Sequence, residues 1–148
     1  MSLAGIDTNF TLPARFYTST EIFKEELERI FYSRWIYVAC EADLPKPGDY
    51  VALKIGTRSF FLQRNERGEV HGFYNVCRHR GHELVQGEKG NRKRLLCPYH
   101  NWSYDLNGNL LNARGMNSDF PKEDFGLNPI EVAVIWTYLC LSYHACTQ

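Results

Sequence analysis

Hydrophobic and polar positions follow a helical spacing in one early part of the chain, from about residue 19 to residue 33. Apolar side chains recur there three and four positions apart, at Ile22, Phe23, Leu27, Ile30 and Phe31. Charged side chains occupy the positions between them. This spacing predicts one amphipathic helix, and Thr18 with Glu21 fits a capping box at its start.

Short runs rich in aromatic and β-branched residues follow the predicted helix. The turn signals PKPG and NERG separate the runs RWIYVAC, DYVALKI, RSFFLQR and EVHGFY, which therefore predict strands. Asn107-Gly108 in WSYDLNGNLL predicts a tight hairpin, and IEVAVIWTYLCLSY predicts two further strands. With no internal repeat, the pattern favours a small antiparallel sandwich or barrel with a helical arm.

Length and charge limit the function classes. The chain has 148 residues, the size of one domain, and carries 17 basic and 17 acidic side chains. Zero net charge gives no field that would attract nucleic acid or an anionic membrane, so neither is expected as a partner. The first residues lack the pattern of a secretory signal, and the longest apolar stretch is too short to span a bilayer. We therefore expect a cytoplasmic protein.

Two Cys-His pairs form the clearest chemical motif. Five cysteines are present, and in a reducing compartment their thiols favour metal binding over disulfides. The pairs read C-x-H, seventeen intervening residues, then C-x-x-H. We call Cys77, His79, Cys97 and His100 the four candidate ligands. They allow either a tetrahedral zinc site or a [2Fe-2S] cluster whose two irons carry thiolates and imidazoles, respectively.

The surrounding residues resemble a known family. The spacing of the four candidate ligands is similar to the signature of Rieske iron-sulfur domains. FYNVCRHRGHELVQGEKGN and RLLCPYHNWSYDLNGNLL resemble the cluster loops of Rieske non-haem iron oxygenase α subunits, of the aromatic ring-hydroxylating dioxygenase type and related monooxygenases. LPARFYTSTEIFKEELERIFYSRWIYVACEADLPKPGDY resembles their N-terminal segment. The resemblance covers nearly all of residues 10 to 136.

The resemblance implies a mainly β fold: a Rieske-type antiparallel β-sandwich with a small cluster-binding loop subdomain and an N-terminal helical arm. Residues 1–34 would form the arm and residues 35–143 the Rieske [2Fe-2S] domain. Cys77 and Cys97 would bind one iron of the cluster, and His79 and His100 the other. The family's catalytic domain, with its mononuclear Fe(II), is expected to be absent from this chain. We therefore expect no catalytic residues and no hydroxylation by the chain alone.

The resemblance also implies partners. An NAD(P)H-dependent reductase or a ferredoxin would supply electrons, which the domain would pass toward the mononuclear iron of an oxygenase. The complete oxygenase would be a homotrimer or hexamer. Two alternatives stay open: a stand-alone Rieske ferredoxin that carries electrons, and a structural zinc module without redox activity.

Further residues around the motif carry weaker expectations. Rieske proteins of cytochrome bc complexes have disulfide cysteines where this chain has His82 and Tyr99, and a serine where it has Trp102, so we expect a low-potential centre. Trp102 and Tyr104 lie at strand spacing and are expected to pack. The basic run Arg92–Arg94 is either solvated or the docking point of an acidic reductase or ferredoxin.

Overall fold

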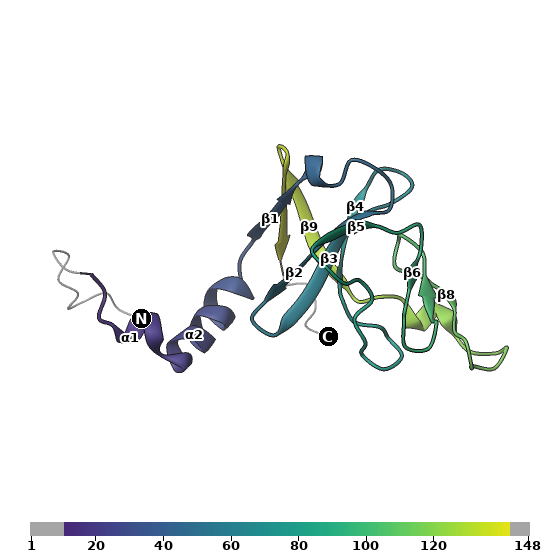
Figure 1. Ribbon diagram of the computed structural model, residues 1–148, viewed down its shortest axis with the longest axis horizontal. Helices are drawn as coiled ribbons and strands as arrows, with labels where there is room; N and C mark the ends of the chain where they lie inside the picture. Colours follow the sequence, from purple (N-terminus) through teal and green to yellow (C-terminus); the bar gives the residue numbers. More distant parts are fainter. Residues whose placement is uncertain (1–10, 143–148) are drawn as a thin grey trace.

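Short antiparallel strands dominate residues 11–142, the part of the chain that the computed structural model describes (Figure 1). Seven strands form one curled sheet in the order β1-β10-β9-β4-β3-β2-β5, and three more form a small sheet in the order β6-β7-β8. The seven are β1 (Ile36–Cys40), β2 (Asp49–Ile55), β3 (Arg58–Arg64), β4 (Val70–Tyr74), β5 (Lys89–Asn91), β9 (Pro129–Ile135) and β10 (Tyr138–Ser142). The small sheet contains β6 (Leu95–Leu96), β7 (Ser103–Tyr104) and β8 (Leu110–Asn112). The expected mainly β, antiparallel fold is confirmed.

The predicted N-terminal helix is present as the last two of three short helical segments that form an arm. They are α1 (Arg15–Thr18), α2 (Thr20–Glu26) and a π-helical turn, η1 (Leu27–Phe31). The predicted cap is wrong by one residue, because Ser19 Oγ accepts the Ile22 amide at 3.3 Å whereas Thr18 bonds back to the Ala14 carbonyl. Ser19 is the N-cap residue because its backbone is extended, whereas Thr18 is part of the preceding helix.

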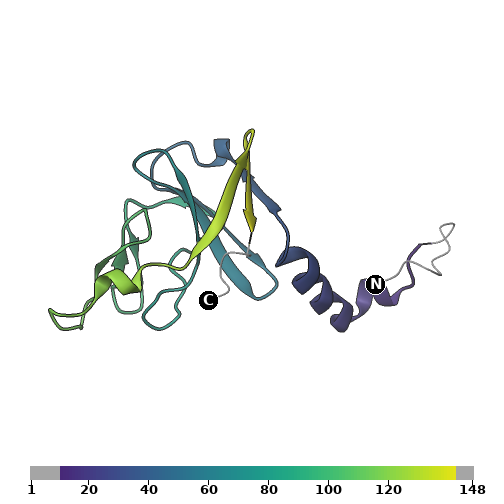
Figure 2. The same cartoon turned by 180° about the vertical axis from the view of Figure 1, so that it is seen from behind.

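The arm lies at one end of the long axis of the molecule and the small sheet at the other (Figures 1 and 2). No side chain of its three segments is buried. The arm joins the sheet through Tyr32, whose hydroxyl donates to the Ile55 carbonyl at 3.0 Å and whose ring lies 3.8 Å below the Arg58 guanidinium. Within residues 11–142, no helix is both long and apolar enough to cross a membrane.

The curl of the large sheet brings its two ends together around a hydrophobic core. One cluster joins Ala39 of β1, Val51 of β2, Leu62 of β3 and Leu139 of β10, together with Leu44. A second cluster joins Phe60, Ile130 and Leu141. These side chains are almost fully removed from water, so their burial is a main stabilising contribution.

Strand β3 is buried on both of its faces. Phe60 and Leu62 face the core inside the curl, whereas Phe61 belongs to a separate cluster that it shares with the small sheet. Adjacent side chains of a strand point to opposite faces, so one strand can serve two cores. β3 is therefore part of the layer that the scaffold shares with the loop subdomain.

The small sheet begins beyond β5 and contains the predicted Asn107-Gly108 hairpin between β7 and β8. Asp105 Oδ1 accepts the amides of Asn107 and Asn109, and Gly108 adopts a φ of +84°. An added Cβ at Gly108 would approach the Phe73 ring to 2.5 Å, so this turn requires glycine for both conformation and space. The strands β5 and β6 were not predicted, because three-residue and two-residue strands show no readable alternation.

Candidate metal centre

The two ligand loops share one backbone design. In the first loop the Cys77 amide donates to the His82 carbonyl at 2.9 Å, and the Gly81 amide donates to the Cys77 carbonyl at 3.0 Å. In the second loop the Cys97 amide donates to the Trp102 carbonyl at 2.8 Å, and the Asn101 amide donates to the Cys97 carbonyl at 3.0 Å. Each cysteine thus opens a six-residue turn that carries one candidate histidine ligand.

Each turn passes through a left-handed residue four positions after its cysteine. Gly81 has a φ of +71° and Asn101 a φ of +61°. Glycine adopts this conformation without steric cost, and asparagine tolerates it better than most other residues. The turns that present the two candidate histidine ligands therefore explain why Gly81 and Asn101 stand at these positions.

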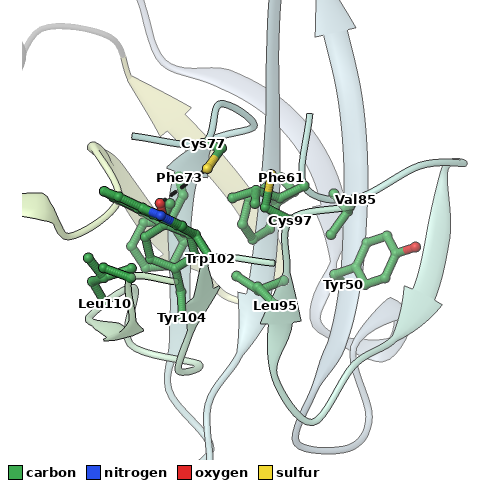
Figure 3. Close-up of a cluster of buried hydrophobic side chains, with 13 residues drawn as sticks. Tyr50, Phe61, Phe73, Cys77, Val85, Leu95, Cys97, Trp102, Tyr104 and Leu110 are labelled. Carbon is green, nitrogen blue, oxygen red and sulfur yellow. Dashed lines mark hydrogen bonds between the residues drawn. The ribbon is translucent and has the colours of Figure 1, made fainter. Parts of the chain in front are cut away.

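Both candidate thiol ligands lie in the hydrophobic cluster between β3 and the small sheet (Figure 3). Cys77 and Cys97 are each 2% exposed, and their side chains interact with each other. Burial raises the pKa of the Cys97 thiol, while hydrogen bonds from the backbone of Tyr99 and His100 act to lower it. The two sulfurs are thus neighbours in a water-poor setting that already supplies hydrogen bonds to one of them.

The candidate imidazole ligands form a second pair. The ring centroids of His79 and His100 are 4.7 Å apart, and the planes meet at 70°. In both rings Nδ1 is buried and has no hydrogen-bond partner within the described residues. The pKa of His100 is lowered, mainly by burial and to a smaller extent by the nearby charges of His79 and Arg80. The lowered pKa favours the neutral imidazole, which is the form that can bind a metal.

The donor set fits an iron-sulfur cluster. Buried nitrogens without a partner are rare in folded proteins, and two of them here belong to candidate ligands. Within residues 11–142 no group of three or more His, Cys, Asp or Glu side chains could hold a single metal ion. The four candidate ligands are arranged as one thiol pair and one imidazole pair, the donor types that a Rieske cluster takes at its two irons.

Aromatic side chains pack against both imidazoles. Trp102 stacks on the His79 ring at a centroid distance of 4.8 Å, and Tyr99 stacks on the His100 ring at 3.8 Å. Trp102 is buried, and its indole N–H donates to the Arg114 carbonyl at 3.3 Å rather than toward the ligands. The ring of His82 lies 5.9 Å from that of Tyr99, so an aromatic contact joins the loops where bc-type relatives have a disulfide.

Tyr104 has a role that the sequence did not reveal. It is fully buried as expected, but its hydroxyl lies 3.4 Å from Cys77 Sγ and accepts the Arg78 amide at 3.1 Å. Since the oxygen accepts from the amide, the O–H is free to donate to the sulfur. Tyr104 therefore packs as expected, and its hydroxyl has an additional polar contact that was not predicted. Its burial alone could have indicated a bonded hydroxyl, although not which partner it has.

Asn75 is a second residue that the sequence did not single out. Its Oδ1 accepts the amides of Leu84 and Val85 at 2.9 and 3.0 Å, and its Nδ2 donates to the Val85 carbonyl at 2.9 Å. The side chain is 2% exposed, so these bonds replace those that water would make. Asn75 thereby ties the start of the first ligand loop to its end.

Comparisons with known proteins agree with this geometry. Residues 34–133 match the family model described as the Rieske [2Fe-2S] domain. The chain is 39% identical over 141 residues to the glycine betaine monooxygenase oxygenase subunit of Pseudomonas aeruginosa, covering 95% of this chain and 33% of that protein. It is 39% identical over 125 residues to the carnitine monooxygenase oxygenase subunit of Escherichia coli K12, covering 83% and 33%.

Solved structures show the same relation. The quaternary ammonium Rieske monooxygenase CntA with L-carnitine superposes with a TM-score of 0.82 at 34% identity, over 92% of this chain and 39% of that one. Naphthalene 1,2-dioxygenase with indole superposes with a TM-score of 0.77 at 33% identity, over 83% and 29%. The chain therefore spans about a third of the length of the curated relatives that it matches, at their N-terminal part.

Proposed function

Since the chain belongs to the Rieske [2Fe-2S] domain family and its relatives are oxygenase subunits, we propose that it is the electron-transfer domain of an oxygenase α subunit. The observation that carries this proposal is the pairing of two buried thiols with two imidazoles whose buried Nδ1 atoms have no hydrogen-bond partner among residues 11–142. Residues 35–143 would form the domain and residues 1–34 its arm; residues 1–10 and 143 of these ranges lie outside the described residues. The relatives favour this function over a stand-alone ferredoxin, because they are oxygenase subunits.

The four candidate ligands would hold the cluster, with the cysteines on one iron and the histidines on the other. When bound, a cluster of this type takes up and releases one electron, and its imidazole ligands raise its potential above that of an all-cysteine cluster. The surrounding residues have separate tasks. Tyr104 would donate to the Cys77 sulfur once that sulfur is a thiolate ligand, Trp102 and Tyr99 pack against the two imidazole rings, and Asn75 holds the first loop closed.

The electron would come from an NAD(P)H-dependent reductase or a ferredoxin and would pass toward a mononuclear iron of the complete oxygenase. We expect this in the cytoplasm, within a homotrimer or hexamer. The relatives include oxygenase subunits for glycine betaine, carnitine and salicylate. Because domains of one kind serve these different substrates, our proposal concerns the electron-transfer step and not the substrate.

Anaerobic purification followed by metal analysis and EPR tests this function. We expect two irons and two acid-labile sulfides per chain, and a rhombic signal of low average g value after reduction with dithionite. A colourless protein with one zinc would overturn the proposal. The Cys97→Ser variant is expected to lose iron and sulfide, whereas Cys40→Ser, which changes a half-buried thiol of β1, should retain both.

The imidazole end requires its own test. A His79→Cys variant that still assembles should have a lower potential and a weaker pH dependence of that potential, because an anionic thiolate replaces a titratable neutral ligand. A variant with the potential and the pH response of the wild type would show that the assignment of His79 is wrong.

A further inference from the structure

Positive charge is concentrated around the ligand loops. Residues 77–104 hold six of the 17 basic side chains and only two of the 17 acidic ones, although the whole chain is neutral. Arg78 and Arg80 flank His79 in the first loop, and Arg92–Arg94 precede the second. All five side chains are exposed. The region that carries the candidate ligands is therefore basic, while the remainder of the chain is acidic.

A cavity of about 500 Å³ lies at the basic run Arg92–Arg94. The buried Leu84 and Leu95 line it from inside, and Leu96 and Pro98 are exposed beside it. Within residues 11–142, none of the three cationic side chains forms an ion pair. We call Arg92–Arg94 with Leu96 and Pro98 the basic apolar surface.

The backbone holds the basic apolar surface in place. The Arg92 amide donates to the Gly48 carbonyl at 2.9 Å, and the Arg92 carbonyl accepts from the buried Gln63 side chain at 3.4 Å. At the other end of the run, Leu95 pairs with Tyr104 in the small sheet. The backbone that carries the three cations is thus held at a fixed position, next to the two-residue strand β6 that leads to the candidate ligand Cys97.

We infer that the basic apolar surface receives an acidic protein that donates electrons, whose carboxylates face Arg92–Arg94 while apolar side chains at its contact cover Leu96 and Pro98. This inference rests on the proposed function. Leu96 is 53% exposed, and an exposed leucine beside unpaired cations suits a protein contact with an apolar centre and a charged rim. None of the cationic side chains is buried in the cavity, as a site for a small anion would require.

Charge complementarity acts mainly on the rate of association. One electron leaves the reduced donor and one is taken up by the domain, so no further reactant is needed. Because the cations lie beside the ligand loop, a donor attracted there arrives close to the centre that it must reduce. The surface therefore determines which redox protein delivers the electron. It does not set the reduction potential of the centre.

Stopped-flow reduction of the cluster-loaded chain tests the inference. The probe is a reduced, strongly acidic plant-type [2Fe-2S] ferredoxin, used over a range of ionic strength. The test variant changes Arg92, Lys93 and Arg94 to Gln, and the control changes three exposed cations elsewhere, Lys24, Lys54 and Arg67, to Gln. At low salt we expect the second-order rate constant of the test variant to fall about tenfold or more, and that of the control by less than about twofold. At high salt all three proteins should converge.

Equal rates for the test variant and the wild type at low salt would overturn the inference, as would an equal loss in the control. A wild-type rate independent of ionic strength would also overturn it. EPR after dithionite reduction separates these results from a failure of the proposed function. If the wild type shows no Rieske signal, the function fails. If the signal is present in every protein and the rates do not differ, only the docking surface fails.

Discussion

Replacing Tyr104 by Phe removes one hydroxyl from the centre and leaves the ring in place. The oxygen lies 3.4 Å from Cys77 Sγ and accepts the Arg78 amide at 3.1 Å. Reduction adds negative charge, so a donor to a ligand sulfur stabilises the reduced state more than the oxidised one. Loss of that donor should therefore lower the reduction potential.

The size of the shift follows from the strength of such a bond. A hydrogen bond to a charged group contributes about 1.5–3 kcal/mol, and we assign about 1 kcal/mol of it to the difference between oxidation states. Because 59 mV corresponds to a tenfold change in a one-electron equilibrium, this is about 40 mV. Redox titration followed by EPR or circular dichroism measures it.

A matched control is available in the same hydrophobic cluster. Tyr50 is also buried, and its hydroxyl donates to the Gln86 carbonyl at 3.0 Å rather than to a ligand. Tyr50→Phe should lower the free energy of unfolding by about 1 kcal/mol and leave the potential unchanged. Two results would refute the assigned role of Tyr104. One is an equal reduction potential in Tyr104→Phe and Tyr50→Phe, and the other is a reduction potential of Tyr104→Phe above that of the wild type.

Three further predictions concern stability. Asn75→Ala should lower the free energy of unfolding by about 2–4 kcal/mol in urea titrations and reduce iron retention, because it leaves two buried amides unpaired. An unchanged free energy of unfolding and iron content would contradict the role of Asn75 in closing the loop. The metal-free chain should lose stability as pH falls below 6.5, because the pKa of His100 is lowered in the folded state and the unfolded state therefore takes up the proton first. The His100→Gln variant should flatten this part of the stability profile, and an unaltered slope would refute this role of His100. In thermal unfolding, Gly108→Ala should cost about 1–3 kcal/mol more stability than Gly115→Ala. Both glycines have positive φ, but only an added Cβ at Gly108 would clash with Phe73. Equal losses would show that the backbone conformation alone accounts for the cost.

Much of the architecture could be predicted from the sequence because its signals are local. Strands such as DYVALKI and RSFFLQR are bounded by turn residues and appear as β2 and β3 with the expected limits. The helix limits were less certain, since Thr18, Ser19 and Thr20 can each cap a helix and only the backbone conformation selects among them. β5 and β6 depend on pairing with distant strands, which no local pattern contains.

The candidate centre was predictable only in part. The spacing of the four candidate ligands identifies the site, and the structure brings them together as two pairs. That assignment as cluster ligands stays a prediction until a cluster is measured. The roles of Tyr104 and Asn75 could not be read from the chain, because each depends on a partner up to 27 residues away and a hydrophobic pattern does not specify where a polar atom will point.

The two-sided burial of β3 has a consequence for engineering. The cluster that holds the candidate thiols and the core inside the curl are separate, and β3 belongs to both, with Phe61 on one side and Phe60 and Leu62 on the other. The neighbouring β2 is shared in the same way, through Tyr50 and Val51. A protein engineer could therefore redesign the scaffold core or graft other cluster-binding loops, provided that the alternation of β2 and β3 is kept. Modularity in this domain is limited by two neighbouring strands of seven residues each.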